Sequence, residues 1–268
     1  MQTTLPHLIP GNDLPQSDSR KSDLPKHDLQ NNDLQKNDPR QKLIVALDVS
    51  TAAAAHNIVA AIGDSAFTYK VGMQLYTAEG PRLVRDLVAA GRRLFLDLKY
   101  HDIPTTVGAA VHEAAKLGVS MLTVHTSGSR KMLRAAVDAA RAVNPALIVL
   151  GVTVLTSMDE NDLEKIGIQN TVQDEVLRLA SLALDCGCQG IVTSARETSR
   201  VRSEFGHNFA IVTPGVRPAG SAHGDQVRVV TPAEAIAAGA SHIVVGRPIT
   251  EAADPAAAAH TILGQIGS

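Results

Sequence analysis

The chain has 268 residues, of which 44% are hydrophobic and 19% are charged, and its formal net charge is −2. This near-neutral charge gives no reason to expect a nucleic acid or a membrane surface as the partner, and no apolar run approaches the ~20 residues of a membrane span. The N-terminus lacks the apolar core of a signal peptide. The two cysteines, Cys186 and Cys188, have a C-x-C spacing that fits neither a zinc site nor a disulfide framework. We therefore expect a protein of the reduced, cytoplasmic compartment.

Residues 1–41 differ in composition from the rest of the chain. Asp recurs every five residues from Asp13 to Asp38, and the residues between are mostly Asn, Gln, Ser, Lys and Pro. A period of five fits neither a helix nor a strand, and the segment has too little apolar surface to offset the entropy lost on ordering. We expect residues 1–41 to be a disordered pentad-repeat tail, with a partner-binding motif as the alternative, and residues 42–268 to be the folded domain.

From Leu43 onward, short apolar runs alternate with alanine-rich stretches that favour helices, such as 82–90 and 132–143. The runs are rich in Val, Ile and Leu without polar alternation, which is typical of parallel strands covered on both faces. Eight such units in about 225 residues predict an α/β fold of the TIM (β/α)8 barrel type. A doubly wound open sheet is the alternative, although no G-x-G-x-x-G follows the first run. The expected strands are 43–47, 67–71, 94–98, 121–124, 147–154, 190–193, 209–213 and 242–245.

The third of these runs ends in a group of charges. Asp97 and Lys99 lie two residues apart, so on a strand they project to the same side, and Asp102 follows in the loop. Lys70 ends the preceding strand, about 4.8 Å away in a sheet. Charges at the end of an apolar strand are costly to bury unless they pair or meet a ligand. A structural ion pair is one interpretation, but a TIM barrel carries its active site at this end of its strands.

The last two strands are followed by loops that contain glycine, arginine and proline. In TIM barrels the loops after strands seven and eight often bind phosphate. Gly246 lets backbone N–H groups approach an anion closely, and Arg217 and Arg247 offer planar forks to phosphate oxygens. Gln226 lies in the long polar stretch after strand seven. The alternative is that the glycines only form turns and the arginines are solvated.

Taken together, these motifs resemble the bacterial type of the orotidine 5′-monophosphate decarboxylase family over the whole expected barrel. Residues 97–106, Asp-Leu-Lys-Tyr-His-Asp-Ile-Pro-Thr-Thr, are similar to the family signature D-x-K-x-x-D-I-P-x-T. The resemblance implies decarboxylation of orotidine 5′-monophosphate (OMP) to uridine 5′-monophosphate (UMP) and CO₂, the last step of de novo pyrimidine nucleotide biosynthesis, without a cofactor. Further support comes from residues 47–48, 70–72, 155–157, 214–217 and 245–250.

The resemblance also implies a role for each residue at a motif position. Lys99 is the expected proton donor, in a catalytic set completed by Asp97, Asp102 and Lys70. Asp102, Ile103 and Thr106 are expected to reach into the partner's site of a homodimer. The expected substrate contacts are Asp48 and Lys70 at the ribose, Asp97 near the carboxylate, Thr156 or Ser157 at the pyrimidine, Arg217, Gln226, Gly246 and Arg247 at the phosphate, and Pro214 in the same loop as Arg217.

The expected chemistry is electrostatic. Loss of CO₂ from C6 leaves a carbanion in the plane of the ring, where the π system cannot delocalise it. No residue pattern indicates pyridoxal phosphate, thiamine or a metal, so the Lys99 ammonium would stabilise the charge and then protonate C6. Two alternatives stay open. A Mg²⁺-dependent sugar-phosphate decarboxylase or aldolase of the same suprafamily would carry an acidic metal ligand where this chain has Lys70. A non-catalytic nucleotide-binding barrel would not need all four charged residues.

Overall fold

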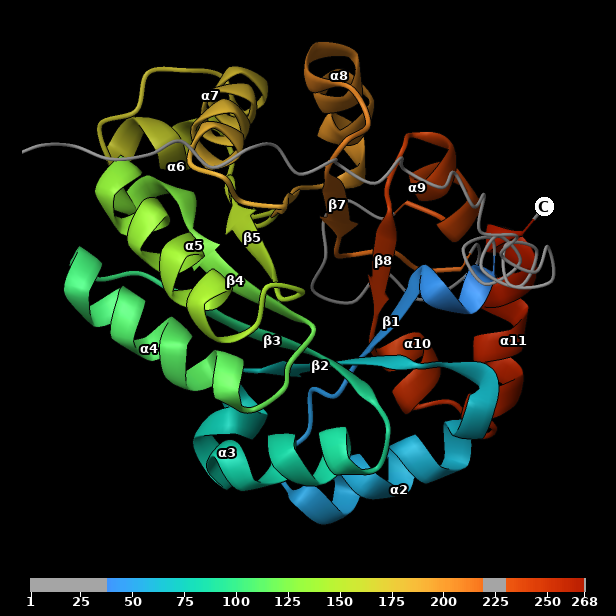
Figure 1. The fold of residues 1–268 in the computed structure, drawn as a ribbon. Helices are drawn as coiled ribbons and strands as arrows, with labels where there is room; N and C mark the ends of the chain where they lie inside the picture. The colour runs from blue at the N-terminus through green and yellow to red at the C-terminus, as the bar shows by residue number, and fades with distance from the viewer. Residues whose placement is uncertain (1–37, 219–229, 268) are drawn as a thin grey trace, which may run out of the picture. The chain divides into compact units, whose positions relative to one another are not determined.

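The computed structural model of the chain describes residues 38–218 and 230–267. Within these residues, eight parallel strands form a closed barrel in the order β1 to β8, and β8 pairs with β1 (Figure 1). The predicted TIM barrel is confirmed, and the open sheet is wrong. The strands are β1 (Leu43–Ala46), β2 (Thr68–Gly72), β3 (Arg93–Tyr100), β4 (Met121–His125), β5 (Ile148–Val152), β6 (Gly190–Val192), β7 (Ala210–Thr213) and β8 (His242–Val245).

Helices follow the strands and surround the barrel (Figure 1). The α-helices of the described residues are α2 (Ala52–Ile62), α3 (Met73–Ala89), α4 (Pro104–Lys116), α5 (Arg130–Val143), α6 (Glu160–Lys165), α7 (Val172–Asp185), α8 (Ala195–Phe205), α9 (Pro232–Ala237), α10 (Arg247–Thr250) and α11 (Pro255–Ile266). Three short 3₁₀ turns are η1 (Pro39–Gln41), η2 (Gly63–Ser65) and η3 (Thr126–Gly128).

Many helices begin where the sequence supplies a side-chain cap. The Thr51 hydroxyl accepts a hydrogen bond from the Ala54 N–H at the start of α2, and capping boxes start α6 (Asp159 with Asp162) and α9 (Thr231 with Glu234). Helix α3 is interrupted at Gly80, whose φ of 66° lies in the left-handed region that glycine tolerates. These local signals set the first residues of α2, α6 and α9.

Apolar residues form two layers, one inside the barrel and one between the strands and the helices. The larger cluster joins the outward faces of the strands to the buried faces of the helices. The smaller one fills the barrel, because residues two apart along a strand share a face. Its buried members are Ile44, Ala46, Phe95, Met121, Leu150, Val212 and Val244. This packing closes the barrel below the charged residues at the carboxyl ends of the strands.

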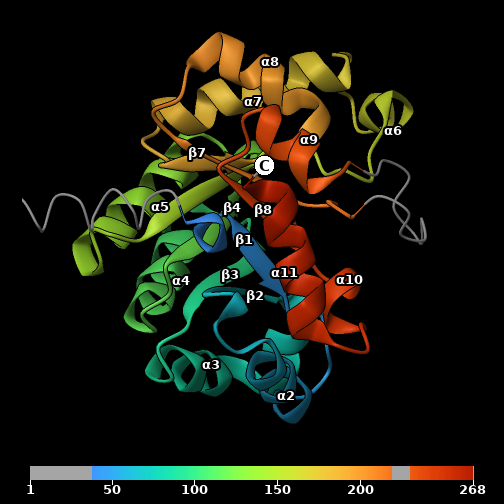
Figure 2. The same ribbon diagram turned by 90° about the vertical axis from the view of Figure 1, so that its right-hand side faces the viewer.

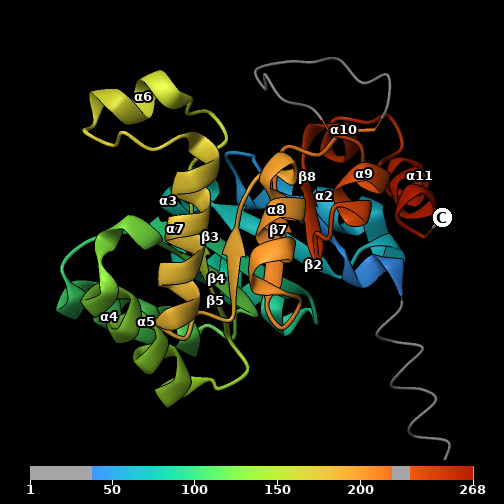
Figure 3. The ribbon, with the colours of Figure 1, turned by 90° about the horizontal axis from the view of Figure 1, so that it is seen from above.

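The helices that follow β5 and β8 mark the carboxyl end of the barrel. Helix α6 follows β5 and α10 follows β8 directly, and both lie at the top in Figure 3. Helix α11 contacts both α2 and α9, so it completes the ring of helices (Figure 2). Among the described residues, no helix is both long and apolar enough to cross a membrane.

The described chain begins a few residues before β1. Residues 38–41, which the sequence analysis assigned to the tail, comprise Asp38 and the turn η1 that it caps. The Arg40 guanidinium bonds the Asp38 carboxylate and lies 4.5 Å from the centre of the Phe67 ring. This cation–π contact explains why the turn packs on the barrel although it is polar. The remainder of the expected tail, residues 1–37, lies outside the described residues.

Candidate active site

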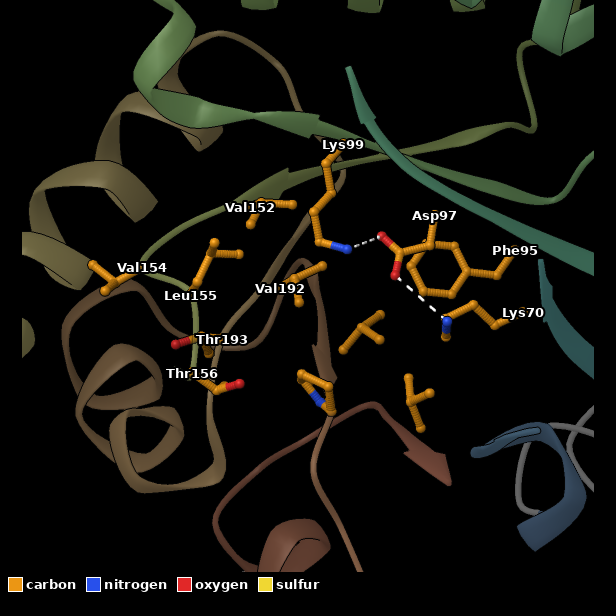
Figure 4. Close-up of a pocket in the computed structure, with 13 residues that line it drawn as sticks. Lys70, Phe95, Asp97, Lys99, Val152, Val154, Leu155, Thr156, Val192 and Thr193 are labelled. Carbon is orange, nitrogen blue, oxygen red and sulfur yellow. Dashed lines mark hydrogen bonds and ion pairs between the residues drawn. The ribbon is translucent and has the colours of Figure 1, made fainter. Parts of the chain in front are cut away.

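Asp97 lies at the centre of a charged network at the carboxyl ends of β2 and β3. Its Oδ1 atom is 2.9 Å from Lys99 Nζ, and its Oδ2 atom is 3.8 Å from Lys70 Nζ. Figure 4 shows both lysine side chains pointing toward this carboxylate from different strands. The register explains the meeting, because Lys70 pairs with Phe95 and therefore shares a face of the sheet with Asp97, two residues further along β3. The sequence prediction that Lys70, Asp97 and Lys99 converge is therefore matched by the geometry.

Asp48 extends this network beyond Lys70. Its Oδ1 atom is 3.0 Å from Lys70 Nζ, so each lysine has a carboxylate partner. A Cβ atom on Gly72 would lie 3.1 Å from Lys70 Nζ and 3.5 Å from Asp48 Oδ1. A side chain at this position would contact both groups, and the Lys70 ammonium would have to shift slightly to admit it. The sequence analysis quoted Gly72 in a motif but gave it no role.

Exposure differs strongly between the members of this network. The Asp97 side chain is 14% exposed and Lys70 13%, whereas Asp48 is 60% exposed. Lys99 is 25% exposed. Two ammonium groups lie within 4 Å of the Asp97 carboxylate and pair with it at this depth. Two lysines and two aspartates leave the network with no net charge before a ligand arrives.

The network opens into a pocket whose walls are mostly apolar. Phe95 and Val244 come from the barrel interior, and Thr156 follows β5 with its side chain at the pocket (Figure 4). Apolar walls exclude water and strengthen the field of the charges beside them. The lining residues are Lys70, Phe95, Asp97, Lys99, Val152, Val154, Leu155, Thr156, Val192, Thr193, Val212, Pro214 and Val244.

The backbone at Lys99 is unusual. Its φ is 50°, one of two positive values at non-glycine positions in the described residues. Between Leu96 and Tyr100, β3 advances four residues while β4 advances two, from Leu122 to Val124. This bulge re-aims the end of β3. The sequence analysis treated this segment as a regular strand ending at Leu98, so it missed the left-handed residue, because lysine carries no signal for it.

A threonine opposite the bulge completes the local hydrogen bonding. Thr123 Oγ1 lies 3.0 Å from Asp97 Oδ1 and accepts the Lys99 N–H at 2.9 Å. The sequence analysis did not select Thr123, because threonine is an ordinary strand residue. Only the pairing of β3 with β4 brings it to the site.

The three residues expected to serve a partner subunit do not join the network within one chain. The Asp102 carboxylate accepts the N–H of Ile103, the next residue, and no ion pair links it to Lys99 among the described residues. Ile103 is 63% exposed, and Thr106 is exposed in the first turn of α4. The expected four-charge cluster is thus incomplete in the single chain, where Asp48 is the second carboxylate. The shared role of these residues stays a prediction.

The expected phosphate residues are only partly brought together. A Cβ atom on Gly246 would lie 3.7 Å from Asp48 Oδ2, so the loop after β8 adjoins the charged network. Arg217 is buried at 7% exposure, Arg247 is exposed at the start of α10, and neither lines the pocket. Gln226 lies outside the described residues. Of the pyrimidine candidates, Thr156 lines the pocket and Ser157 does not.

Two histidines lie beside the charged network. The rings of His101 and His125 are 5.4 Å apart between centroids. Burial lowers the pKa of His125, and the nearby His101 and Lys99 lower it further. A neutral His125 ring beside Lys99 adds no positive charge to the site near neutral pH.

Comparisons with known proteins identify the family of this chain. A family model described as the orotidine 5′-phosphate decarboxylase / HUMPS family matches residues 41–262. The chain is 49% identical over 226 residues to an orotidine 5′-phosphate decarboxylase of Idiomarina loihiensis, covering 84% of this chain and 98% of the relative. It is 50% identical over 227 residues to that of Halorhodospira halophila, covering 85% and 96%.

A solved structure supports the same assignment. The crystal structure of orotidine 5′-phosphate decarboxylase from Lactobacillus acidophilus superposes with a TM-score of 0.77 at 36% identity, covering 85% of this chain and 100% of that one. The resemblance drawn from residues 97–106 is thereby confirmed. The chain belongs to the orotidine 5′-phosphate decarboxylase / HUMPS family.

Proposed function

We propose that this chain converts OMP to UMP and CO₂ without a cofactor, and that Lys99 donates the proton to C6. Membership of the family makes the chain a carboxy-lyase of pyrimidine nucleotide biosynthesis. The observation that supports the finer proposal is the row Lys70–Asp97–Lys99 at the edge of an apolar pocket. In this row the Lys99 ammonium can supply a proton. The fixed charges create an electric field at the place where a carbanion would form.

The proposed step breaks the bond between C6 and the carboxyl carbon. The electron pair stays on C6 and CO₂ departs as a neutral molecule. The Lys99 ammonium, held 2.9 Å from Asp97, stabilises the pair as it forms and then transfers one proton to it. Lys99 leaves the step neutral and regains a proton from water.

Asp97 is proposed to act on the substrate before the bond breaks. Its carboxylate is only 14% exposed and would face the carboxylate of OMP, so the two negative charges repel in a setting of low polarity. Departure of CO₂ relieves that repulsion. Asp97 also orients Lys99, because its Oδ1 atom accepts a hydrogen bond from the Lys99 ammonium.

Ribose and phosphate are proposed to bind on the side of Asp48 and Gly246. Asp48 is the exposed end of the network and contacts Lys70 at 3.0 Å, which suits a pair of ribose hydroxyls. Gly246 lies beside Asp48. A phosphate held by the loop after β8, with Arg217, Gln226 and Arg247, would therefore be separated from the pyrimidine by the ribose at Asp48. Thr156 or Ser157 would contact the pyrimidine, with Pro214 at the pocket wall. Contacts far from C6 supply binding energy that can orient the ring.

A homodimer is part of the same proposal. Ile103 exposes an apolar side chain, and the exposed Asp102 carboxylate accepts the N–H of Ile103, so both residues lie where another surface could reach them. With Thr106, they are proposed to complete the partner's site. A reduced, cytoplasmic setting is likewise proposed, supported by free thiols at Cys186 and Cys188, both buried.

A Mg²⁺-dependent sugar-phosphate enzyme of the same family is the competing function. Such an enzyme needs an acidic oxygen ligand where Lys70 stands. The Lys70 ammonium lies between Asp48 and Asp97, at 3.0 and 3.8 Å, and therefore occupies the space between the two carboxylates that a divalent ion would use. This observation favours the OMP reaction.

The test is to follow ultraviolet absorbance after OMP is added to protein treated exhaustively with EDTA. The proposal expects a full absorbance change and UMP as the product. Lys131→Ala, at an exposed position on α5, should match the wild type, which controls for loss of a lysine elsewhere. Loss of activity on EDTA treatment with recovery on adding Mg²⁺ would contradict the cofactor-free mechanism.

A further inference from the structure

Thr123 is placed to control the geometry of both proposed catalytic side chains. It lies on β4, opposite the segment of β3 where the register shifts. Thr123 is fully buried. Its single hydroxyl contacts Asp97 Oδ1 at 3.0 Å and the Lys99 backbone nitrogen at 2.9 Å.

The direction of each hydrogen bond follows from the atoms. The Lys99 N–H can only donate, so the Thr123 oxygen must accept there. The one hydroxyl proton of Thr123 is then available for Asp97, which accepts it as a carboxylate. The hydroxyl therefore holds the backbone of Lys99 and the side chain of Asp97 at the same time.

Both groups need such support. The φ of Lys99 is 50°, a conformation that costs an L-residue free energy and persists where its surroundings fix it. Asp97 Oδ1 also receives Lys99 Nζ at 2.9 Å, while Oδ2 faces Lys70 at 3.8 Å. A rotation of the carboxylate would change both lysine contacts. The Thr123 proton on Oδ1 opposes that rotation.

We propose that Thr123 is a positioning residue, which fixes the left-handed backbone of Lys99 and the rotamer of Asp97 so that the ammonium meets C6. The inference rests on the proposed function, because it concerns the same reaction. It predicts an effect on the chemical step, since the hydroxyl is already committed to Asp97 and Lys99 and does not line the pocket. Binding of the product, UMP, should change little.

The chain offers a matched control at Thr68. Thr68 is also fully buried in the barrel, on β2, and its Oγ1 atom has no hydrogen-bond partner among the described residues. Thr123→Val and Thr68→Val therefore make the same chemical change at equal burial. Only the first removes a bonded hydroxyl. Thr123→Ser keeps the hydroxyl and loses a methyl group, so it separates hydrogen bonding from packing.

The experiment measures kcat with OMP, the Kd of UMP and the melting temperature for the wild type and these three variants. A lost hydrogen bond to a charged group should lower kcat of Thr123→Val by about 10- to 100-fold, with the Kd of UMP within about threefold. Thr123→Ser should keep kcat within about threefold, and Thr68→Val should match the wild type. Thr123→Val with near-normal kcat, or an equal loss in Thr123→Ser, would overturn the inference.

A crystal structure of Thr123→Val gives a readout that does not depend on activity. The inference expects Lys99 to leave its left-handed conformation, or Lys99 Nζ to move beyond hydrogen-bond distance from Asp97. Unchanged geometry would overturn it, even if the wild type proves inactive toward OMP. A wild type without activity would contradict the proposed function alone, so the two failures are distinguishable. Should Thr123→Val not fold, Thr123→Ala and Thr123→Ser carry the same comparison.

Discussion

Replacement of Lys99 probes the proposed chemistry and the local strain at once. Lys99→Ala and Lys99→Gly both remove the ammonium that lies 2.9 Å from Asp97. Only glycine also relieves the backbone, because Lys99 has a φ of 50°. We expect both variants to be nearly inactive and the glycine variant to be the more stable of the two.

The size of the rate loss follows from the charge. An ammonium within about 4 Å of a developing unit negative charge contributes about 4 kcal/mol at an effective dielectric constant near 20, or about a thousandfold in rate. Proton transfer by a positioned group contributes about a further 10²- to 10⁴-fold. Lys99→Ala should therefore lower kcat by about 10⁵-fold or more, while the Kd of UMP changes far less.

The size of the stability difference follows from the backbone. A left-handed conformation costs an L-residue about 1–2 kcal/mol, and glycine avoids this cost. Lys99→Gly should exceed Lys99→Ala in unfolding free energy by about 1 kcal/mol, after allowance for the greater entropy of glycine in the unfolded chain. Absorbance kinetics and urea denaturation provide the two measurements, with Lys131→Ala as the control. A kcat within tenfold of wild type would refute Lys99 as the proton donor, and equal stability would refute the strain.

Three further predictions follow from other residues. Mixing Lys99→Ala and Asp102→Ala homodimers, with subunit exchange confirmed separately, should restore activity at about a quarter of all sites if Asp102 serves the partner's site; no recovery would place both residues in one site. Burial lowers the pKa of His242 to about 4 from its ordinary value of 6.5. Between these two pH values the unfolded state binds a proton at His242 that the folded state does not bind. His242 thus stabilises the fold above pH 6.5 by about 3 kcal/mol, which is lost as the pH falls toward 4; in His242→Val the urea-derived unfolding free energy should fall less over this range, and an unchanged slope would refute the assignment. Arg202 donates to three backbone carbonyls and one hydroxyl, so Arg202→Lys should lower the unfolding free energy by about 2–3 kcal/mol, whereas Arg200→Lys at an exposed pair should change it little.

The barrel could be predicted from the sequence because its strands are continuous apolar runs. The expected strand 242–245 coincides with β8, and the expected 121–124 differs from β4 by one residue. The expected 147–154 is longer than β5, which ends at Val152. Val154 continues the apolar run beyond the strand because it lines the pocket. A purely local reading cannot separate a strand residue from a pocket wall of the same polarity.

The charged centre of the site could be predicted, but its supporting geometry could not. Lys70, Asp97 and Lys99 were selected from strand ends and spacing, and they lie together. The left-handed Lys99 and the bonded Thr123 depend on the register between β3 and β4, which no local pattern specifies. The role proposed for Asp102 depends on a second subunit, which the spacing of residues in one chain does not specify.

The most direct test of the central claim is to run the reaction in D₂O with EDTA-treated protein and examine the product by NMR and mass spectrometry. The account predicts that OMP is consumed, that CO₂ is released, and that UMP carries one deuterium, located at C6, where the exchanged Lys99 ammonium delivers it. Absence of UMP, deuterium at a position other than C6, or turnover only after Mg²⁺ is added would contradict the account.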